Sequence, residues 1–192
     1  PYDVDFNNDG TKMYMFGSTN DTVYEYDLST AYDVSTATYN SSSFSLSAQD
    51  SVGRSIVFKP DGTKLYYVGA NADNVYQYSL STAWDITTAS YDSVSFYVGT
   101  QDGIPTGITF NNDGTKFYIT GLTNDTVYQY SMSTAYNMST ASYDSVSFSV
   151  TSQAPNPYGI QFNSDGTKMY ILDANNDSIY QYSLSTAFNV ST

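Results

Sequence analysis

The chain has 192 residues and a formal net charge of −13, with 13% charged and 17% aromatic residues. Such an acidic surface repels phosphate groups, which argues against a nucleic acid partner and against an anionic membrane surface. The sequence contains no Cys and no His, which excludes disulfides, thiolate chemistry and the commonest general base and transition-metal ligand.

A short stretch recurs four times along the chain at a constant spacing of 52 residues, without insertion or deletion. In every copy a Phe leads into the tetrapeptide Asp-Gly-Thr-Lys. Repeats of this length indicate structural units that stack and share one continuous core. The four copies begin at Phe6, Phe58, Phe110 and Phe162, and their aspartates are Asp9, Asp61, Asp113 and Asp165.

The third repeat is complete and predicts four antiparallel strands. Residues 107–110 carry apolar side chains at alternate positions, the periodicity of a strand, and an Asp-Gly turn leads into a second strand at 116–120. This second strand is apolar on both faces, so we expect it to be covered on both. A third strand at 127–132 follows another polar turn. A longer connection then leads to a fourth strand at 143–150, where Val and Phe alternate with Ser.

Four short antiparallel strands per repeat are typical of a β-propeller blade. We therefore expect an all-β, single-domain array with blades at residues 1–52, 53–104, 105–156 and 157–192. A β-helix is the alternative, but its coils are shorter and lack such hairpin turns. The last blade is predicted to lack its fourth strand. Because a closed ring protects its sheet edges, we expect the array to belong to a larger ring or to pair with a second copy into eight blades.

The recurring aspartates have a structural explanation. In an Asp-Gly turn the Asp side chain bonds nearby backbone groups, and we expect the Lys three residues later to lie across the hairpin as its partner. A second set occupies the next hairpin, whose left-handed backbone conformation Asp tolerates. This second set is Asp21, Asp73, Asp125 and Asp177.

A metal site is suggested at one place only. Asp5 to Gly10 match the first half of a calcium-binding EF-hand loop. However, Phe16 stands where the closing Glu should be, and the other repeats have no acid in place of Asp5. We therefore expect no cofactor, with a weak Ca²⁺ site built from turn oxygens as the alternative.

Three residues are candidates for ligand binding because they depart from the repeat. Arg54 is the only Arg and lies in a variable loop, where it could anchor a carboxylate or sugar acid or form a surface ion pair. Trp84 is the only Trp and could stack on a sugar. However, the equivalent residue of every repeat is aromatic, which favours a role in packing. Tyr158 belongs to the variable loop that precedes the fourth blade.

The pattern Pro-x-Gly-apolar-x-Phe, followed by Asp-Gly and then Lys-apolar-Tyr, is present at 105–118 and 157–170. With these residues the chain resembles, over its whole length, the β-propeller repeats of the YVTN and lactonase-like type. Its Asp-Gly-Thr-Lys and Val-Tyr-Gln-Tyr strings look like those of marine bacterial and phage proteins. The resemblance implies a propeller fold. Members of that family include lactone-hydrolysing enzymes, surface-layer proteins and adhesive propellers, and no catalytic set of the enzymes is matched residue by residue.

These observations favour a non-catalytic binding or adhesion module of a phage or bacterial surface protein, with weak multivalent glycan recognition. The expected location is extracellular or on a virion surface. The expected partners are its own copies, flanking blades or a glycan, and not nucleic acid or a membrane. One alternative is a purely structural repeat of a larger assembly. A less favoured one is a lactonase-like, metal-dependent hydrolase, since the only Glu, Glu25, replaces a Gln of the other repeats.

Overall fold

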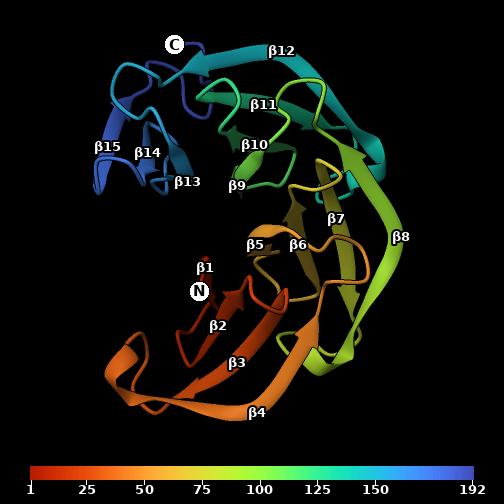
Figure 1. Ribbon diagram of the computed structural model, residues 1–192. Helices are drawn as coiled ribbons and strands as arrows, with labels where there is room; N and C mark the ends of the chain where they lie inside the picture. Colours follow the sequence, from red (N-terminus) through yellow and green to blue (C-terminus); the bar gives the residue numbers. More distant parts are fainter. The chain divides into compact units, whose positions relative to one another are not determined.

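The computed structural model describes all 192 residues, which form four antiparallel sheets with almost no helix (Figure 1). Each sheet is a propeller blade, and its strands are hydrogen-bonded in chain order. The all-β prediction, the four blades and the three-stranded last blade are confirmed. None of the helical segments is long or apolar enough to cross a membrane.

The strands of each blade follow one another along the chain. Three-residue 3₁₀ turns lie in the connections at Val34–Thr36, Ile86–Thr88 and Met138–Thr140. The first blade comprises β1 (Asp3–Phe6), β2 (Lys12–Gly17), β3 (Thr22–Leu28) and β4 (Ala37–Ser45), and the second comprises β5 (Gly53–Phe58), β6 (Lys64–Gly69), β7 (Asn74–Leu80) and β8 (Ala89–Tyr97). The third comprises β9 (Pro105–Phe110), β10 (Lys116–Gly121), β11 (Thr126–Met132) and β12 (Ala141–Ser149), and the fourth comprises β13 (Pro157–Phe162), β14 (Lys168–Asp173) and β15 (Ser178–Ser183).

The chain divides into two compact units, Pro1–Ser95 and Phe96–Thr192. The first unit contains the first two blades except for the end of β8, and the second unit contains the last two. Each unit is described by itself below.

The Asp-Gly turn joins the first two strands of every blade in the same way. In the third blade Asp113 accepts hydrogen bonds from the backbone N–H of Thr115 at 2.9 Å and from its hydroxyl at 2.5 Å. Gly114 has a φ of +69°, and a Cβ at this position would lie 2.1 Å from the ring of Tyr136. The glycine is therefore required both for the turn and for the aromatic ring that covers it.

In the first three blades the lysine after the Asp-Gly turn pairs with an acid of the third or fourth strand and not with the turn aspartate, so that prediction is wrong there. Lys116 instead reaches Asp144 on the fourth strand at 2.8 Å, and Lys64 reaches Asp92 at 3.0 Å. The alternation of side chains along a strand sends the lysine across the sheet rather than back over the turn. The aspartates of the next hairpin all have positive φ, between 45° and 53°, as predicted.

The second strand of each blade forms the centre of the packing. In the second blade Leu65, Tyr66, Tyr67 and Val68 have no exposed surface at all, so both faces of β6 are covered, as its sequence predicts. Complete burial of such side chains stabilises the fold by about 1.5–3 kcal/mol each.

A bulge lies in the fourth strand, just before its alternating Val and Phe residues. In the third blade the register shifts between Gln129 and Tyr130 of β11, and the bulged residue Ser145 has a φ of 58°. The first blade has the same register shift, and Ser41 and Ser93 repeat the positive φ. The extra residue turns Asp144 toward β11, because a bulge re-aims the side chains beside it.

Adjacent blades within a unit are joined by tyrosine hydroxyls. Tyr14 of β2 donates to the carbonyl oxygen of Trp84 at 2.5 Å. Tyr118 of β10 makes the same bond to the carbonyl of Phe188 at 2.5 Å. In both units the second strand of one blade therefore holds the long connection of the next.

Candidate ligand-binding site

The first strand of each blade, here called the inner strand, is where the repeats differ most in chemistry. β1 carries two carboxylates, Asp3 and Asp5, and β5 carries the only Arg, Arg54. The inner strands of the second unit have no charged residue, since β9 reads PTGITF and β13 reads PYGIQF. The charged groups of the inner strands are therefore confined to β1 and β5, in the first unit.

The two carboxylates of β1 bind the edge of β5. Asp3 accepts the hydroxyl of Ser55 at 2.5 Å and the backbone N–H of Ile56 at 2.9 Å. Asp5 accepts the backbone N–H of Phe58 at 2.8 Å. Each carboxylate thus reaches one blade further along the chain and satisfies backbone donors that have no strand beside them.

Arg54 lies at the beginning of β5, beside the first residues of the chain. Its Nη1 donates to the hydroxyl of Tyr2 at 3.0 Å, and its guanidinium carbon lies 5.3 Å from the centre of the Tyr2 ring. The quadrupole of an aromatic ring attracts a guanidinium group that lies on its face, and the N–H donors of this group lie in one plane. The beginning of β5 therefore carries a cation, whereas Asp5 bonds Phe58 at the other end of this strand.

Burial changes the acidity of both carboxyl groups. Loss of solvent raises the pKa of Asp5 from 3.8 to about 6, partly offset by hydrogen bonds from Phe58 and Phe6, and the charge of Asp3 raises it further. Loss of solvent also raises the pKa of Asp3. A carboxyl group with a pKa near 6 exchanges its proton close to neutral pH, which is the property of a general acid or base.

The second unit makes the same contact between inner strands without charge. Thr106 donates its hydroxyl to the carbonyl of Pro157 at 2.7 Å, and Thr109 donates to the amide oxygen of Gln161 at 2.8 Å. The fold therefore requires a polar contact between adjacent inner strands but not a carboxylate. The carboxylates of β1 satisfy backbone donors of β5, but the second unit shows that this contact can be made without charge.

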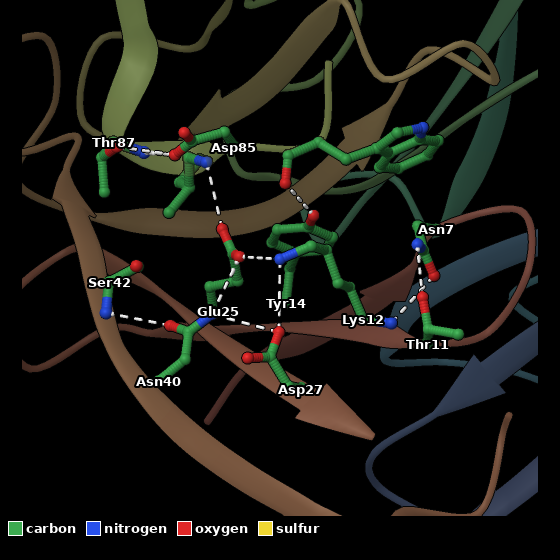
Figure 2. A network of polar contacts seen from close by, with 12 residues as sticks. Asn7, Thr11, Lys12, Tyr14, Glu25, Asp27, Asn40, Ser42, Asp85 and Thr87 are labelled. Atoms are coloured by element: carbon green, nitrogen blue, oxygen red, sulfur yellow. Dashed lines mark hydrogen bonds and ion pairs between the residues drawn. The ribbon is translucent and has the colours of Figure 1, made fainter. Parts of the chain in front are cut away.

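The only Glu of the chain has a structural role (Figure 2). Glu25 is 3% exposed and forms an ion pair with Lys12. It also accepts from the Asn40 side chain at 2.9 Å and from the backbone N–H of Ile86 at 3.1 Å. Figure 2 shows these partners converging on its carboxylate from β2, β4 and the connection of the second blade.

The next two blades hold the same network with the acid and the amide exchanged. Gln77 donates its amide to Asp92 at 2.6 Å, and Gln129 donates to Asp144 at 2.8 Å. Where those blades have Gln on the third strand and Asp on the fourth, the first blade has Glu and Asn. The acid of this network can therefore stand on the third or the fourth strand. In the first blade this acid is Glu25, which holds the lysine and the neighbouring blade in place.

A second kind of buried carboxylate, Asp50 or Asp102, closes the loops that lead into the second and third blades. Asp102 accepts the backbone N–H groups of Ile104 and Thr123, both at 3.0 Å, and of Asn124 at 3.1 Å. These acids are not apparent from the sequence pattern alone. They become visible only when two positions are compared together, because a repeat that lacks the acid at one position carries it at the other.

Within the first unit, the structure places the predicted ligand residues Arg54 and Trp84 at different ends of one strand. Arg54 lies near the beginning of β5, whereas Trp84 packs against Phe58 at its end, with ring centroids 5.4 Å apart. The Trp84 ring also covers Gly62, where a Cβ would lie 2.4 Å from it. Tyr158 lies on β13 in the second unit. Sugar binding by Trp84 or Tyr158 stays a prediction.

The oxygens of the EF-hand-like stretch are engaged within the protein. Asp9 accepts from the backbone and hydroxyl of Thr11 at 3.0 and 2.6 Å, and Asn7 accepts from the backbone of Lys12 at 2.9 Å. The structure contains no group of three or more acidic side chains placed to hold a metal ion. Binding of Ca²⁺ stays a prediction.

Comparison with known proteins shows the fold. No family model matches the chain, and no curated protein matches its sequence. Among solved structures, a candidate 6-phosphogluconolactonase from Bacteroides uniformis aligns with a TM-score of 0.65 and 13% identity, over 95% of this chain and 50% of that one. The periplasmic gluconolactonase PpgL of Pseudomonas aeruginosa aligns with a TM-score of 0.60 and 13% identity, over 94% and 48%. A protein from Lactobacillus plantarum aligns with a TM-score of 0.66 and 17% identity, over 94% and 50%.

These neighbours include lactonase-like β-propeller proteins, and the chain spans about half the length of each. They correct the expectation that the chain is not an enzyme, because proteins with this arrangement of blades are named as lactonases, which are hydrolases. At 13–17% identity the likeness is one of fold. The chain therefore shares the β-propeller fold of these proteins.

Proposed function

We propose that the first unit binds a sugar lactone on the inner strands β1 and β5 and hydrolyses it to the sugar acid. The observation that carries the proposal is the confinement of Asp3, Asp5 and Arg54 to this strand pair, while β9 and β13 make the equivalent contact with uncharged groups. The fold neighbours named as gluconolactonases support the choice of substrate class.

Hydrolysis of a lactone adds water across the ring ester. A water oxygen bonds to the carbonyl carbon, the bond from that carbon to the ring oxygen breaks, and the ring oxygen takes up a proton. The Asp5 carboxyl, with a pKa of about 6, can take the proton from the attacking water and return it to the leaving oxygen. Arg54, at the other end of β5, can bind the hydroxyl groups of the sugar and orient it.

The charge of the chain favours an uncharged substrate. A net charge of −13 opposes the approach of a phosphorylated sugar, and Arg54 is the only Arg available to offset a phosphate on this surface. We therefore propose glucono-δ-lactone or a similar neutral lactone, rather than its 6-phosphate, as the better substrate.

The test compares variants of the charged and uncharged strand pairs in the full chain. Lactone hydrolysis is followed by the acid it releases, and binding of the lactone and of gluconate by calorimetry. We expect Arg54→Ala and Asp5→Asn each to reduce turnover by about tenfold or more. We expect Thr109→Val, on the uncharged pair, to leave it unchanged. Absence of both turnover and sugar binding in the folded chain, or unchanged turnover in Arg54→Ala, would overturn the proposal.

Multivalent glycan recognition is the second candidate for this surface, and one observation disfavours it. Repeated sites would be supplied by the aromatic residue that follows Ser-Thr-Ala in each repeat. These residues are not equally exposed, since Tyr32 is 58% exposed and Tyr136 only 8%. Location on a virion or outside a bacterial cell stays a prediction.

A further inference from the structure

The outer edge of β15 has no strand beside it, unlike the third strand of every other blade. In the first three blades the fourth strand covers a buried Val of the third strand, which is Val23, Val75 or Val127, each with no exposed surface. The corresponding residue of β15, Ile179, is 69% exposed. An uncovered apolar side chain on an unpaired edge is a site for pairing with another strand.

The same edge presents a lysine without its carboxylate. Lys64 and Lys116 each form an ion pair with an Asp on the fourth strand of their own blade, at 3.0 and 2.8 Å. Lys168 occupies the equivalent position at the start of β14 and forms no ion pair.

The glutamine that normally completes this pair is also uncovered. Gln77 and Gln129 are each 4% exposed and donate to the same aspartates. Gln181 stands at their position on β15 and is exposed. The fourth blade therefore keeps the residues that bind a fourth strand, namely an apolar residue, an amide and an ammonium group.

We propose that the edge of β15 binds an extended strand with the chemistry of β8 and β12. Such a strand carries an Asp at a bulge, which would bond the Lys168 ammonium and the Gln181 amide. It also carries a Phe that would cover Ile179, as Phe148 of β12 pairs with Val127 of β11. Main-chain hydrogen bonds provide the affinity, and the Asp fixes the register.

A second copy of β15 would be a poorer occupant of this edge. The strand has the sequence SIYQYS and contains no acidic residue. Two copies paired edge to edge would leave both Lys168 side chains without a carboxylate. Charge complementarity therefore selects a strand that carries Asp.

The test uses a peptide with the sequence of residues 141–153 and the full 192-residue chain. We expect the peptide to bind, measured by fluorescence anisotropy, and to protect the backbone amides of β15 from hydrogen exchange. Replacing the peptide's Asp with Lys should weaken binding by about tenfold or more. The Lys168→Glu variant should bind this Lys peptide better than the original one.

Two controls keep the proposal falsifiable. Lys116→Glu changes the equivalent lysine of a blade whose fourth strand is in place, so it should leave peptide binding unchanged. Lys168→Ala covers the case in which Lys168→Glu does not fold. The proposal is overturned if the peptide protects no amide of β15, if the charge exchange has no effect, or if light scattering shows a dimer that saturating peptide does not dissociate.

Discussion

Asn156 donates its backbone N–H to the carboxylate of Asp173 at 2.7 Å. In the preceding blade, the acid that accepts the equivalent N–H comes from a different position of the repeat. There, Asp102 accepts the equivalent N–H of Ile104 at 3.0 Å and stands over Gly121, whose Cβ would lie 2.1 Å from the carboxyl carbon. In the fourth blade the acid has moved from the loop to the strand, and Ala154 stands where the loop acid was. The carboxylate is retained because the buried N–H groups need an acceptor.

This exchange predicts strong coupling between positions 154 and 173. Asp173→Gly alone leaves two N–H groups without an acceptor and should cost about 1–3 kcal/mol in the free energy of unfolding. Ala154→Asp alone adds a second carboxylate to the same buried space and should also destabilise. The double variant recreates the pattern of Asp102 and Gly121 and should recover most of the loss. Urea unfolding of the four proteins measures the coupling, and simple additivity of the two losses would contradict it.

The Glu25 network predicts a similar recovery in the first blade. Glu25→Gln removes the ion pair with Lys12 and leaves the introduced amide group facing that of Asn40, so we expect a loss of about 1–2 kcal/mol. Asp27, which bonds Asn40 and Lys12, stands where the later blades have Ser79 and Ser131, so all variants are compared in a chain that carries Asp27→Ser. There, adding Asn40→Asp recreates the arrangement of Gln77 and Asp92 and should restore stability. Thermal unfolding of the single and double variants provides the measurement. A double variant less stable than Glu25→Gln would show that the two networks are not equivalent.

Asp5 predicts an unusual dependence of stability on pH. Because its pKa is raised to about 6 in the folded chain, the folded state binds more protons than the unfolded state between about pH 4 and pH 6. Stability therefore falls as the pH rises through this window, by at most about 3 kcal/mol from this group.

The Asp5→Asn variant isolates this effect from other carboxylates. At Asp61 the loss of solvent is outweighed by hydrogen bonds from Lys59 and Thr63, so its pKa falls to about 2 and it acts in the opposite direction and at lower pH. We expect Asp5→Asn to be more stable than the parent above about pH 6 and equal to it below about pH 4. A constant difference across this range would mean that Asp5 titrates normally.

Glycine replacements distinguish a required glycine from a tolerated one. Gly114→Ala places a Cβ in a left-handed backbone and against the ring of Tyr136, so we expect a loss of well over about 1 kcal/mol. At Gly103 the nearest atom to a Cβ is the Thr123 hydroxyl oxygen, 3.6 Å away, so Gly103→Ala should be nearly neutral. Denaturant unfolding compares the two, and equal losses would contradict the interpretation.

The blades could be predicted from the repeat because the sequence signals that define them involve residues close together in the chain. Alternating apolar residues, Asp-Gly turns and the left-handed aspartates each act over a few neighbouring positions, and the structure places them as expected. The bulge at Ser145 was not predicted, because it lies just before the alternating residues and no residue type marks it in the sequence. The bond from Asp5 to Phe58 joins residues 53 apart, and no local pattern indicates it.

The candidate site was only partly predictable for the same reason. Arg54 was recognised because it is unique, but its position over the Tyr2 ring depends on how two blades pack. The exchanges between Gln77 and Glu25 or between Asp102 and Asp173 are visible in the sequence only after the structure shows which positions touch. Comparing repeats at contacting positions would have separated these structural acids from Asp3 and Asp5.

The bond from the Tyr14 hydroxyl to the carbonyl of Trp84 also bears on how the protein folds. It ties the centre of one blade to a connection that forms only when the next blade has been synthesised. A nascent first blade would keep its most buried tyrosine partly solvated, so the smallest cooperative folding unit is a pair of neighbouring blades. Hydrogen exchange from β2 and β6 should consequently occur in one shared opening event rather than in two independent ones.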